Sequence, residues 1–152
     1  GIMTKILFVC HGNICRSPLA EFLMKDLVQK NGVENSFYIE SAATSAEEIG
    51  NHVYPPVRRI LNGRGIDCSA KRARQMTNSD YNKFDYIICM DSQNLRNMNF
   101  IAKDINNKYL RLLDFTNTPH DVADPWYSGD FETAEKEIEQ GCKALLKSIL
   151  KD

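Results

Sequence analysis

The chain has 152 residues, of which 43% are hydrophobic and 26% charged, and its formal net charge at pH 7 is -1. This length fits one domain with its own core, and the nearly balanced charge argues against nucleic acid or an anionic membrane as partner. The sequence contains neither an apolar run as long as a membrane span, roughly 20 residues, nor the pattern of a signal peptide. We therefore expect a cytoplasmic protein with one domain over residues 3–152, and we interpret Gly1 and Ile2 as the remnant of an expression tag.

The cysteines indicate a reducing compartment. There are five of them, an odd number, and no close pair has a spacing typical of zinc sites. This pattern argues against a secreted disulfide framework and against a structural metal. The five positions are Cys10, Cys15, Cys68, Cys89 and Cys142.

The first elements are a strand, a short loop and a helix. Residues 4–9 contain the apolar run Ile-Leu-Phe-Val, which is typical of a central parallel strand buried on both faces. Pro18 then stands at a first helical position, and apolar residues recur at helical spacing from Leu19 to Val28. Asn31 and Gly32 end this helix.

The loop between this strand and this helix has the size of a phosphate-binding loop. Its backbone N–H groups and the positive end of the helix dipole point into one concavity, which favours a bound oxyanion. Cys10 and Arg16 are separated by five residues, so that both side chains can face the anion. These surroundings favour the thiolate of Cys10, and Arg16 offers a planar fork for two phosphate oxygens. The loop therefore predicts a nucleophile and a phosphate clamp, with Ser17 as a hydrogen-bond donor to the sulfur.

Strand-like and helical patterns alternate along the rest of the chain. Further strands are expected over 37–39, 84–90 and 109–113; helices are expected from Pro55 to Gly63, from Asp91 or Ser92 through Met98, and from Phe131 to Ile149, with a short turn capped by Thr77 or Asn78. This alternation predicts an α/β fold: a doubly wound, four-stranded parallel sheet with helices on both faces and ligands at the carboxyl ends of the strands. Residues 46–54 and 116–130 are expected to be loops, and the second is long enough to indicate a functional role.

Five segments of the chain together resemble the low-molecular-weight protein tyrosine phosphatases. They are Val9–Pro18 with Ala20 and Glu21, Ser41–Ser45, Ala73–Gln75, Cys89–Asp91 and Asp124–Tyr127. The match covers almost the whole chain in the family's order and spacing. It implies a flavodoxin-like fold of the phosphotyrosine phosphatase I type, without metal or cofactor, and hydrolysis of phosphotyrosine in proteins, and of small aryl phosphates, through a cysteinyl-phosphate.

The resemblance implies a role for each matching residue. Cys10 would attack phosphorus, Arg16 and the loop N–H groups would hold the phosphate oxygens, and Asp124 would protonate the leaving oxygen and later activate water. Asn13, Ser17 and Ser41 would support the loop, with ordinary turn residues as the alternative. The complete phosphate-binding loop would comprise His11, Gly12, Asn13, Ile14, Cys15 and Ser17 between the nucleophile and the helix.

Two further roles follow from the same resemblance, each with an alternative. Trp126 and Tyr127 would wall the substrate cleft, although both could instead pack in the core. Cys15 would trap an oxidised Cys10 as a reversible disulfide, although it could instead be a buried bystander thiol.

The chain departs from the family pattern at several positions. Glu47 stands where the family often carries an aromatic residue, so the cleft either loses a wall or gains a negative charge, and acidic phosphopeptides are expected to bind poorly. The family's common His is displaced by Lys71 and Arg72; with Arg58, Arg59, Arg64 and Arg74 these form a basic region that is either a phosphopeptide track or a solvated charged face. His120 could set the ionisation of Asp124.

Three other functions remain as alternatives. A related arsenate reductase needs further cysteines that relay a disulfide, whereas Cys68 and Cys89 lie 21 positions apart. Protein arginine phosphatases tend to have a small Thr where Ile14 stands. A non-catalytic phosphopeptide-binding module would not need Asp124 as a proton donor. The expected partners are phosphotyrosine proteins or peptides, with inorganic phosphate as the product and neither nucleic acid nor membrane; the oligomeric state is left open.

Overall fold

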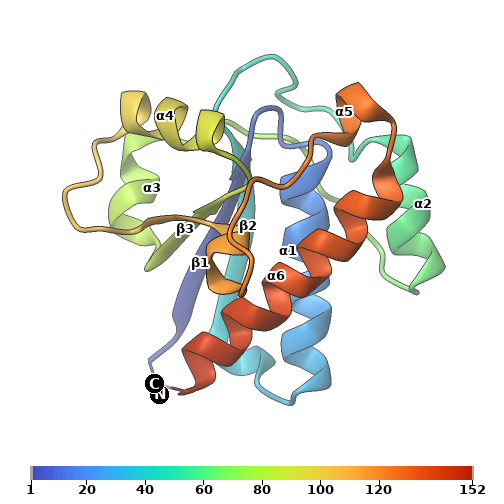
Figure 1. Ribbon diagram of the computed structural model, residues 1–152, viewed down its shortest axis with the longest axis horizontal. Coiled ribbons are helices and arrows are strands. Elements are labelled where there is room, and N and C mark those ends of the chain that lie inside the picture. The colour runs from blue at the N-terminus through green and yellow to red at the C-terminus, as the bar shows by residue number, and fades with distance from the viewer. Residues whose placement is uncertain (1, 152) are drawn as a thin grey trace.

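The computed structural model describes residues 2–151, so Gly1 of the expected tag remnant lies outside the described residues. Four parallel strands form one sheet in the order β2-β1-β3-β4. They are β1 (Thr4–Cys10), β2 (Phe37–Ala43), β3 (Tyr86–Cys89) and β4 (Tyr109–Arg111). The carboxyl ends of β1 and β2, and the loop that follows Cys10, lie toward the top of the molecule in Figure 1. The prediction of a four-stranded parallel sheet is confirmed.

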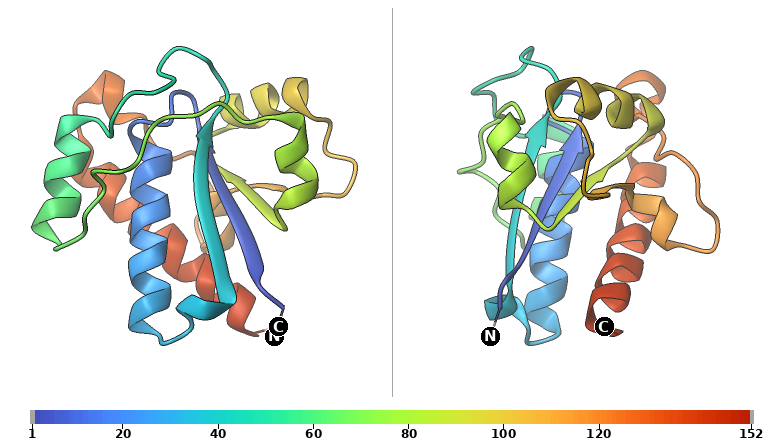
Figure 2. Two further views of the ribbon diagram at one scale, coloured as in Figure 1. Left: turned by 180° about the vertical axis from the view of Figure 1, so that it is seen from behind. Right: turned by 90° about the vertical axis from the view of Figure 1, so that its left-hand side faces the viewer.

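Helices cover both faces of the sheet. The helices are α1 (Arg16–Lys30), α2 (Pro55–Gly63), α3 (Asn78–Lys83), α4 (Ser92–Ile101), α5 (Pro125–Ser128) and α6 (Phe131–Lys151), with 3₁₀ turns η1 (Glu34–Ser36) and η2 (Leu112–Phe115). Helices α1 and α6 share one apolar cluster with one face of β1, whereas α3 and α4 share a second cluster with its other face. Figure 2 shows this doubly wound arrangement from behind and from the side. Within residues 2–151, each helix is too short or too polar to span a bilayer.

The central strand explains why two clusters form. Ile6 and Phe8 belong to the cluster on the α1 side, whereas Leu7 and Val9 belong to the cluster on the α3 side. All four side chains are fully buried, because successive residues of a strand point to opposite faces and helices cover both. The expected burial of this strand on both faces is confirmed. Its fixed position places Cys10, the last residue of β1, at the centre of the sheet's carboxyl edge.

Helix α1 begins two residues earlier than expected, at Arg16 rather than at Pro18. The Leu19 N–H already donates to the Cys15 carbonyl (3.2 Å), so the loop turns directly into the helix. Pro18 fits the first turn because the N–H groups there have no partner within the helix. Arg16 is therefore held by helical backbone rather than by a flexible loop.

Two elements near the C-terminal half also differ from the expected boundaries. Strand β4 ends at Arg111 instead of continuing to residue 113, because the Asp114 carboxylate accepts the Arg111 N–H (2.9 Å) and turns the chain into η2. The loop 116–130 contains the short helix α5, which Asp124 caps by accepting the Trp126 N–H (3.0 Å). Gly129, at φ 73°, ends this helix.

The terminal helix packs more closely than its apolar pattern alone suggests. Helix α6 makes its most extensive contacts with α1 and η2. A Cβ atom added at Gly141 would lie 2.5 Å from the Leu112 Cγ atom, so a glycine is required where α6 crosses η2. This contact anchors η2 and the start of the segment that leads to Asp124.

Candidate active site

The loop that follows β1 forms the floor of a cleft of about 620 Å³. The cleft lies at the carboxyl edge of the sheet, and its lining comes from the loop after β1, the turn after β2, helix α4 and the segment that begins helix α5. Its lining comprises Cys10, His11, Gly12, Ile14, Cys15, Arg16, Glu47, Glu48, Asp91, Gln93, Asn94, Asn97, Asp124, Trp126 and Tyr127. Ten of the sequence-predicted site residues thus face one cleft, and Asn13, Ser17 and Ser41 lie behind its floor.

Cys10 is buried at the end of β1 with hydrogen-bond donors around its sulfur. The Ser17 hydroxyl lies 3.0 Å from the Cys10 Sγ atom, and the Ser17 N–H donates to the same sulfur (3.4 Å). A thiolate at this position is therefore stabilised by donors from the first turn of α1, which also carries the positive end of that helix.

Arg16 is fixed beside the cleft by three oxygen atoms. Its Nη1 atom donates to the Val122 carbonyl (2.8 Å) and lies 2.8 Å from Asp91 Oδ2, while its Nη2 atom lies 3.4 Å from Asp124 Oδ2. Burial opposes the charge on Arg16, but Cys10, Asp124 and Asp91 raise its pKa above the ordinary range. These neighbouring groups keep the guanidinium charged, and because it is only 3% exposed it has little freedom to leave the cleft.

Asp91 is a site residue for which the sequence predicted a helix cap and a place in one of the segments that resemble the family, but no contact with Arg16. It does cap α4, because its Oδ1 atom accepts the Asn94 N–H (2.8 Å). Its second oxygen holds Arg16. The available signal was its position two residues after the end of β3, since the carboxyl ends of neighbouring parallel strands meet at one edge.

Asp124 reaches the same cleft from the opposite end of the chain. One carboxylate oxygen caps α5 and the other lies 3.4 Å from the Arg16 Nη2 atom. Its side chain is partly exposed, unlike that of Arg16. The carboxylate is therefore on the cleft side of Arg16 and accessible to a ligand.

Asn13 holds the loop from behind and has a left-handed backbone conformation, with φ 60°. Its Oδ1 atom accepts the Arg74 N–H (3.1 Å), which orients the amide. The amide nitrogen then donates to the hydroxyls of Ser17 and Ser41, each at 2.9 Å. Because Ser17 accepts this bond, its own hydrogen is free to donate to the Cys10 sulfur.

A buried ion pair continues this chain of hydrogen bonds. The Ser41 hydroxyl donates to Glu21 Oε1 (2.5 Å), and the Lys71 amino group donates to the Ser41 carbonyl (2.8 Å) and lies 3.5 Å from the same carboxylate. Lys25 contacts the other Glu21 oxygen at 2.6 Å. Burial lowers the pKa of Lys71, and Glu21 opposes this effect. The sequence did not predict that Glu21 and Lys71 support the loop, because nothing local shows that a helix residue and a distant loop residue meet there.

The wall at Glu47 gains a negative charge. Glu47 Oε2 lies 3.0 Å from the His11 Nε2 atom, and its side chain is 68% exposed. The neighbouring Glu48 packs its Cγ atom against Gly12, where an added Cβ atom would be only 3.3 Å away. Glu47 therefore lines the cleft as an exposed acidic side chain at the position where the family often carries an aromatic residue.

The aromatic side chains are exposed at the mouth of the cleft. Trp126 is 52% exposed and Tyr127 is 86% exposed, so the alternative that they pack in the core is wrong. Tyr54 supports Trp126, with ring centroids 4.9 Å apart. Both residues can therefore contact a ligand.

Cys15 is a buried thiol beside Cys10 in the cleft lining. Burial, together with the nearby Cys10 and Asp124 groups, raises the pKa of Cys15 to about 12. Cys15 is therefore protonated at neutral pH.

The expected basic region does not form a continuous track. Lys71 and Arg74 bind the carboxylates of Glu21 and Asp80, and Arg64 binds two carboxylates of α6. None of the basic residues predicted for this track lines the cleft that the described residues form. His120, which could have set the ionisation of Asp124, instead contacts Glu137 of α6 at 2.7 Å.

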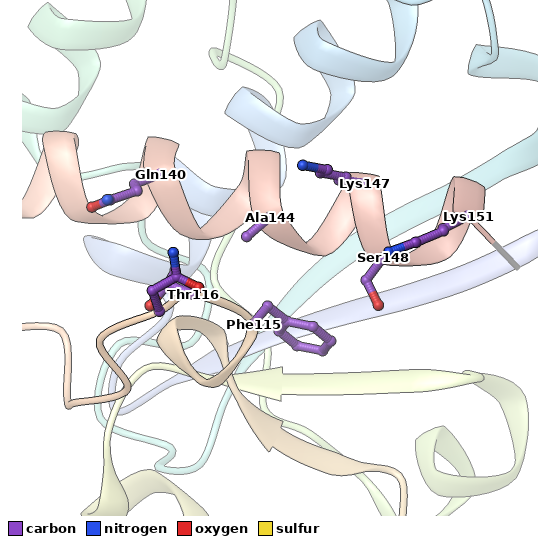
Figure 3. A pocket seen from close by; sticks show the side chains of 8 residues that line it. Phe115, Thr116, Gln140, Ala144, Lys147, Ser148 and Lys151 are labelled. Carbon is purple, nitrogen blue, oxygen red and sulfur yellow. The ribbon is translucent and has the colours of Figure 1, made fainter.

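A second hollow, of about 390 Å³, lies between η2 and the C-terminal half of α6. Figure 3 shows Phe115 and Thr116 on one side of it and Ala144, Lys147, Ser148 and Lys151 on the other. None of the predicted site residues lines this hollow. Nor do residues 2–151 bring together three or more His, Cys, Asp or Glu side chains in an arrangement that could hold a metal ion.

The chain is similar to known phosphatases over nearly its whole length. A family profile described as "Low molecular weight phosphotyrosine protein phosphatase" matches residues 5–152. "Low molecular weight protein-tyrosine-phosphatase YfkJ" of Bacillus subtilis is 40% identical over 99% of this chain and 98% of the relative. The chicken (Gallus gallus) "Low molecular weight phosphotyrosine protein phosphatase" is 39% identical over 97% and 96% of the two chains. The crystal structure of YfkJ superimposes with a TM-score of 0.95, at 41% identity, and covers 99% of this chain and 97% of that one.

Proposed function

Because the chain belongs to the low-molecular-weight phosphotyrosine protein phosphatase family, we propose that it hydrolyses phosphotyrosine in proteins and peptides, and small aryl phosphates, through a cysteinyl-phosphate intermediate. The observation that carries this proposal is the convergence of Cys10, Arg16 and Asp124 on one cleft from two ends of the chain. A nucleophile, a fixed cation and an accessible carboxyl are the groups that transfer of a phosphoryl group to sulfur requires.

In the first step, the Cys10 thiolate attacks phosphorus and the bond between phosphorus and the phenolic oxygen breaks. Arg16 and the loop N–H groups hold the equatorial oxygens as their charge redistributes. The contact of Arg16 with Asp124 (3.4 Å) is longer than its contact with Asp91 (2.8 Å). A bound phosphate would therefore displace Asp124 first, and Asp124 in its protonated form would then donate its proton to the departing phenolate.

In the second step, water attacks the phosphocysteine and releases inorganic phosphate. Asp124 now takes the proton of that water, and Cys10 leaves as a thiolate. The Ser17 hydroxyl, 3.0 Å from the sulfur, stabilises this leaving group. Cys10 and Asp124 thus act in both half-reactions.

We place this chemistry in one catalytic domain over residues 3–152, in the cytoplasm and without a metal ion. Arg16 and the loop amides supply the positive charge that a metal would otherwise supply. A reducing compartment keeps the nucleophilic thiol available, and all five cysteines are free and buried. Cys15 would resolve an oxidised Cys10: its sulfur would replace the hydroxyl of a Cys10 sulfenic acid, giving a disulfide and water.

The alternatives are less well supported. Cys68 and Cys89 belong to apolar clusters on opposite faces of the sheet, which does not suit the disulfide relay of an arsenate reductase. Ile14 lines the cleft and presents an apolar surface to a phenyl ring, where a phosphoarginine would present a polar guanidine. A binding module has no use for Asp124 at the exposed side of Arg16.

The activity is tested with p-nitrophenyl phosphate in the presence of a chelator. We expect the wild-type protein to turn over, Cys10→Ser to be inactive, and Asp124→Ala to lose a factor of about 100 to 10,000 in kcat. Full turnover by Cys10→Ser would refute the cysteinyl-phosphate mechanism, and loss of wild-type activity in the chelator would refute metal independence.

The substrate class is tested with peptides that carry phosphotyrosine, phosphoserine or phosphoarginine in one sequence. We expect kcat/KM to be highest for phosphotyrosine. A preference for phosphoarginine would mean that the same catalytic residues act in a protein arginine phosphatase.

A further inference from the structure

Acidic side chains outnumber basic ones in the lining of the cleft. Four carboxylates line it, those of Glu47, Glu48, Asp91 and Asp124. Asp91 and Asp124 contact Arg16, which a substrate phosphate would also engage. Glu47 and Glu48 belong to the turn after β2 and contact no lysine or arginine among the described residues. This pair of side chains is the acidic rim.

The acidic rim is held against the phosphate-binding loop. The Ser45 N–H and hydroxyl donate to the His11 carbonyl at 3.1 Å and 2.9 Å, which ties the turn to the loop. Glu48 packs on Gly12 and accepts a hydrogen bond from Asn51 (2.5 Å). The two carboxylates therefore keep their positions beside a bound phosphotyrosine.

No lysine or arginine among residues 2–151 forms an ion pair with the acidic rim. The His11 contact offsets the charge of Glu47 only when the imidazole is protonated, and Glu47 is 68% exposed. Glu48 has an uncharged partner in Asn51. The rim thus presents one to two negative charges to the residues that flank a phosphotyrosine.

The opposite wall offers acidic residues no compensating cation inside the cleft. Helix α4 contributes the uncharged side chains of Gln93, Asn94 and Asn97 to the lining; the exposed Arg96 is not part of that lining and donates to Gln93 Oε1 (2.7 Å). The exposed rings of Trp126 and Tyr127 complete the mouth. Aromatic faces next to carboxylates favour a cationic side chain such as lysine or arginine.

We propose that the acidic rim, Glu47 and Glu48, makes this enzyme select phosphotyrosine sites flanked by lysine or arginine and disfavour sites flanked by aspartate or glutamate. This inference rests on the proposed function and adds the substrate class. An acidic flank would place like charges beside the rim, whereas a basic flank would pair with it while the phosphate engages Arg16.

The experiment compares three phosphotyrosine peptides that differ only in the residues flanking the phosphotyrosine on both sides: lysine, glutamine or glutamate. At low salt we expect kcat/KM to fall in that order, by about 1.5- to 5-fold for each charge changed. At an ionic strength of about 1 M the three values should converge, because the Debye length shrinks from about 10 Å to about 3 Å.

Variants of Glu47 and Glu48 test whether the acidic rim causes the preference for lysine-flanked over glutamate-flanked phosphotyrosine. In Glu47→Gln/Glu48→Gln the ratio of kcat/KM for the lysine peptide over the glutamate peptide should fall toward one, and in Glu47→Lys/Glu48→Lys it should fall below one. The matched control is Glu34→Gln, which removes an exposed carboxylate in η1, before β2 and far from its carboxyl end. This control should keep the wild-type ratio.

The outcomes separate the two proposals. Equal kcat/KM for the three peptides, a preference for the glutamate peptide, or an unchanged ratio in the Gln variants would overturn the inference while leaving the phosphatase activity in place. Hydrolysis of neither the peptides nor p-nitrophenyl phosphate would refute the proposed function itself.

Discussion

Replacing Asn13 tests the hydrogen-bond chain behind the phosphate-binding loop. Asn13→Ala removes two bonds donated at 2.9 Å and one accepted at 3.1 Å. It also leaves alanine at φ 60°, a conformation that asparagine tolerates better. Asn13 is 1% exposed, so water cannot readily replace the lost partners.

The expected cost is large because several penalties add. The orphaned Arg74 N–H costs about 1–3 kcal/mol, each lost bond to the two serines costs about 0.5–1.5 kcal/mol, and the left-handed backbone adds about 1 kcal/mol. We expect Asn13→Ala to lower the free energy of unfolding by about 3–7 kcal/mol, a large part of the 5–15 kcal/mol typical of a domain. Activity should fall as well, because the Ser17 hydroxyl loses the bond that directs its hydrogen to Cys10.

Two further variants separate these effects. Asn13→Gly keeps the left-handed backbone without strain, so it should be about 1 kcal/mol more stable than Asn13→Ala. Asn13→Asp keeps an acceptor for the Arg74 N–H but cannot donate, so the Ser17 hydroxyl would donate to the new carboxylate instead of to the sulfur. Asn13→Asp should therefore lose more kcat than Asn13→Gly, by about tenfold or more, since hydrogen bonds to charged groups contribute about 1.5–3 kcal/mol.

The measurements are urea unfolding for stability and kcat for p-nitrophenyl phosphate. If Asn13→Ala loses less than about 1 kcal/mol, the hydrogen bonds to Asn13 do not hold the loop. If Asn13→Asp is as active as the wild type, the direction of the bond between Ser17 and Cys10 is not set by Asn13.

Two other predictions concern the segment that leads to Asp124. Gly141→Ala forces a Cβ atom to within 2.5 Å of Leu112 Cγ, so urea unfolding should show a net loss of about 1–2 kcal/mol despite the better helix propensity of alanine; unchanged stability would mean that η2 shifts freely. The hydrogen bond to the α6 carboxylate of Glu137, and then that to the Thr118 carbonyl, raise the pKa of His120. The stabilisation by this pair is thus complete below about pH 6.5 and is lost as the pH rises through the raised pKa. His120→Ala should accordingly lower Tm by about 1–3 °C at pH 5.5 and leave it unchanged at pH 9, and an equal drop at both values would contradict the ionic contribution.

The sequence by itself determines the parts of this site that are local. Cys10, Arg16 and Ser17 lie within eight consecutive residues between a buried strand and a helix, so the backbone that connects them also orients them. The four strands and most helices were predictable for the same reason, because periodicity and capping residues act over a few positions. The Asp-Pro pair at 124–125 is also a local signal of a helix start, although residues 116–130 were predicted as a loop throughout.

Only the tertiary structure decides which charges meet. Asp91 and the Val122 carbonyl hold Arg16, and Glu21 meets Lys71 across 50 positions of sequence. The basic residues looked like a track in the sequence because their partners come from other elements. Arg64, for example, binds two carboxylates of α6. A charged side chain forms an ion pair with whichever opposite charge the folded structure places within a few ångströms of it. The distance between the two charged groups depends on how whole helices pack against the sheet, and not on which residues are neighbours along the chain.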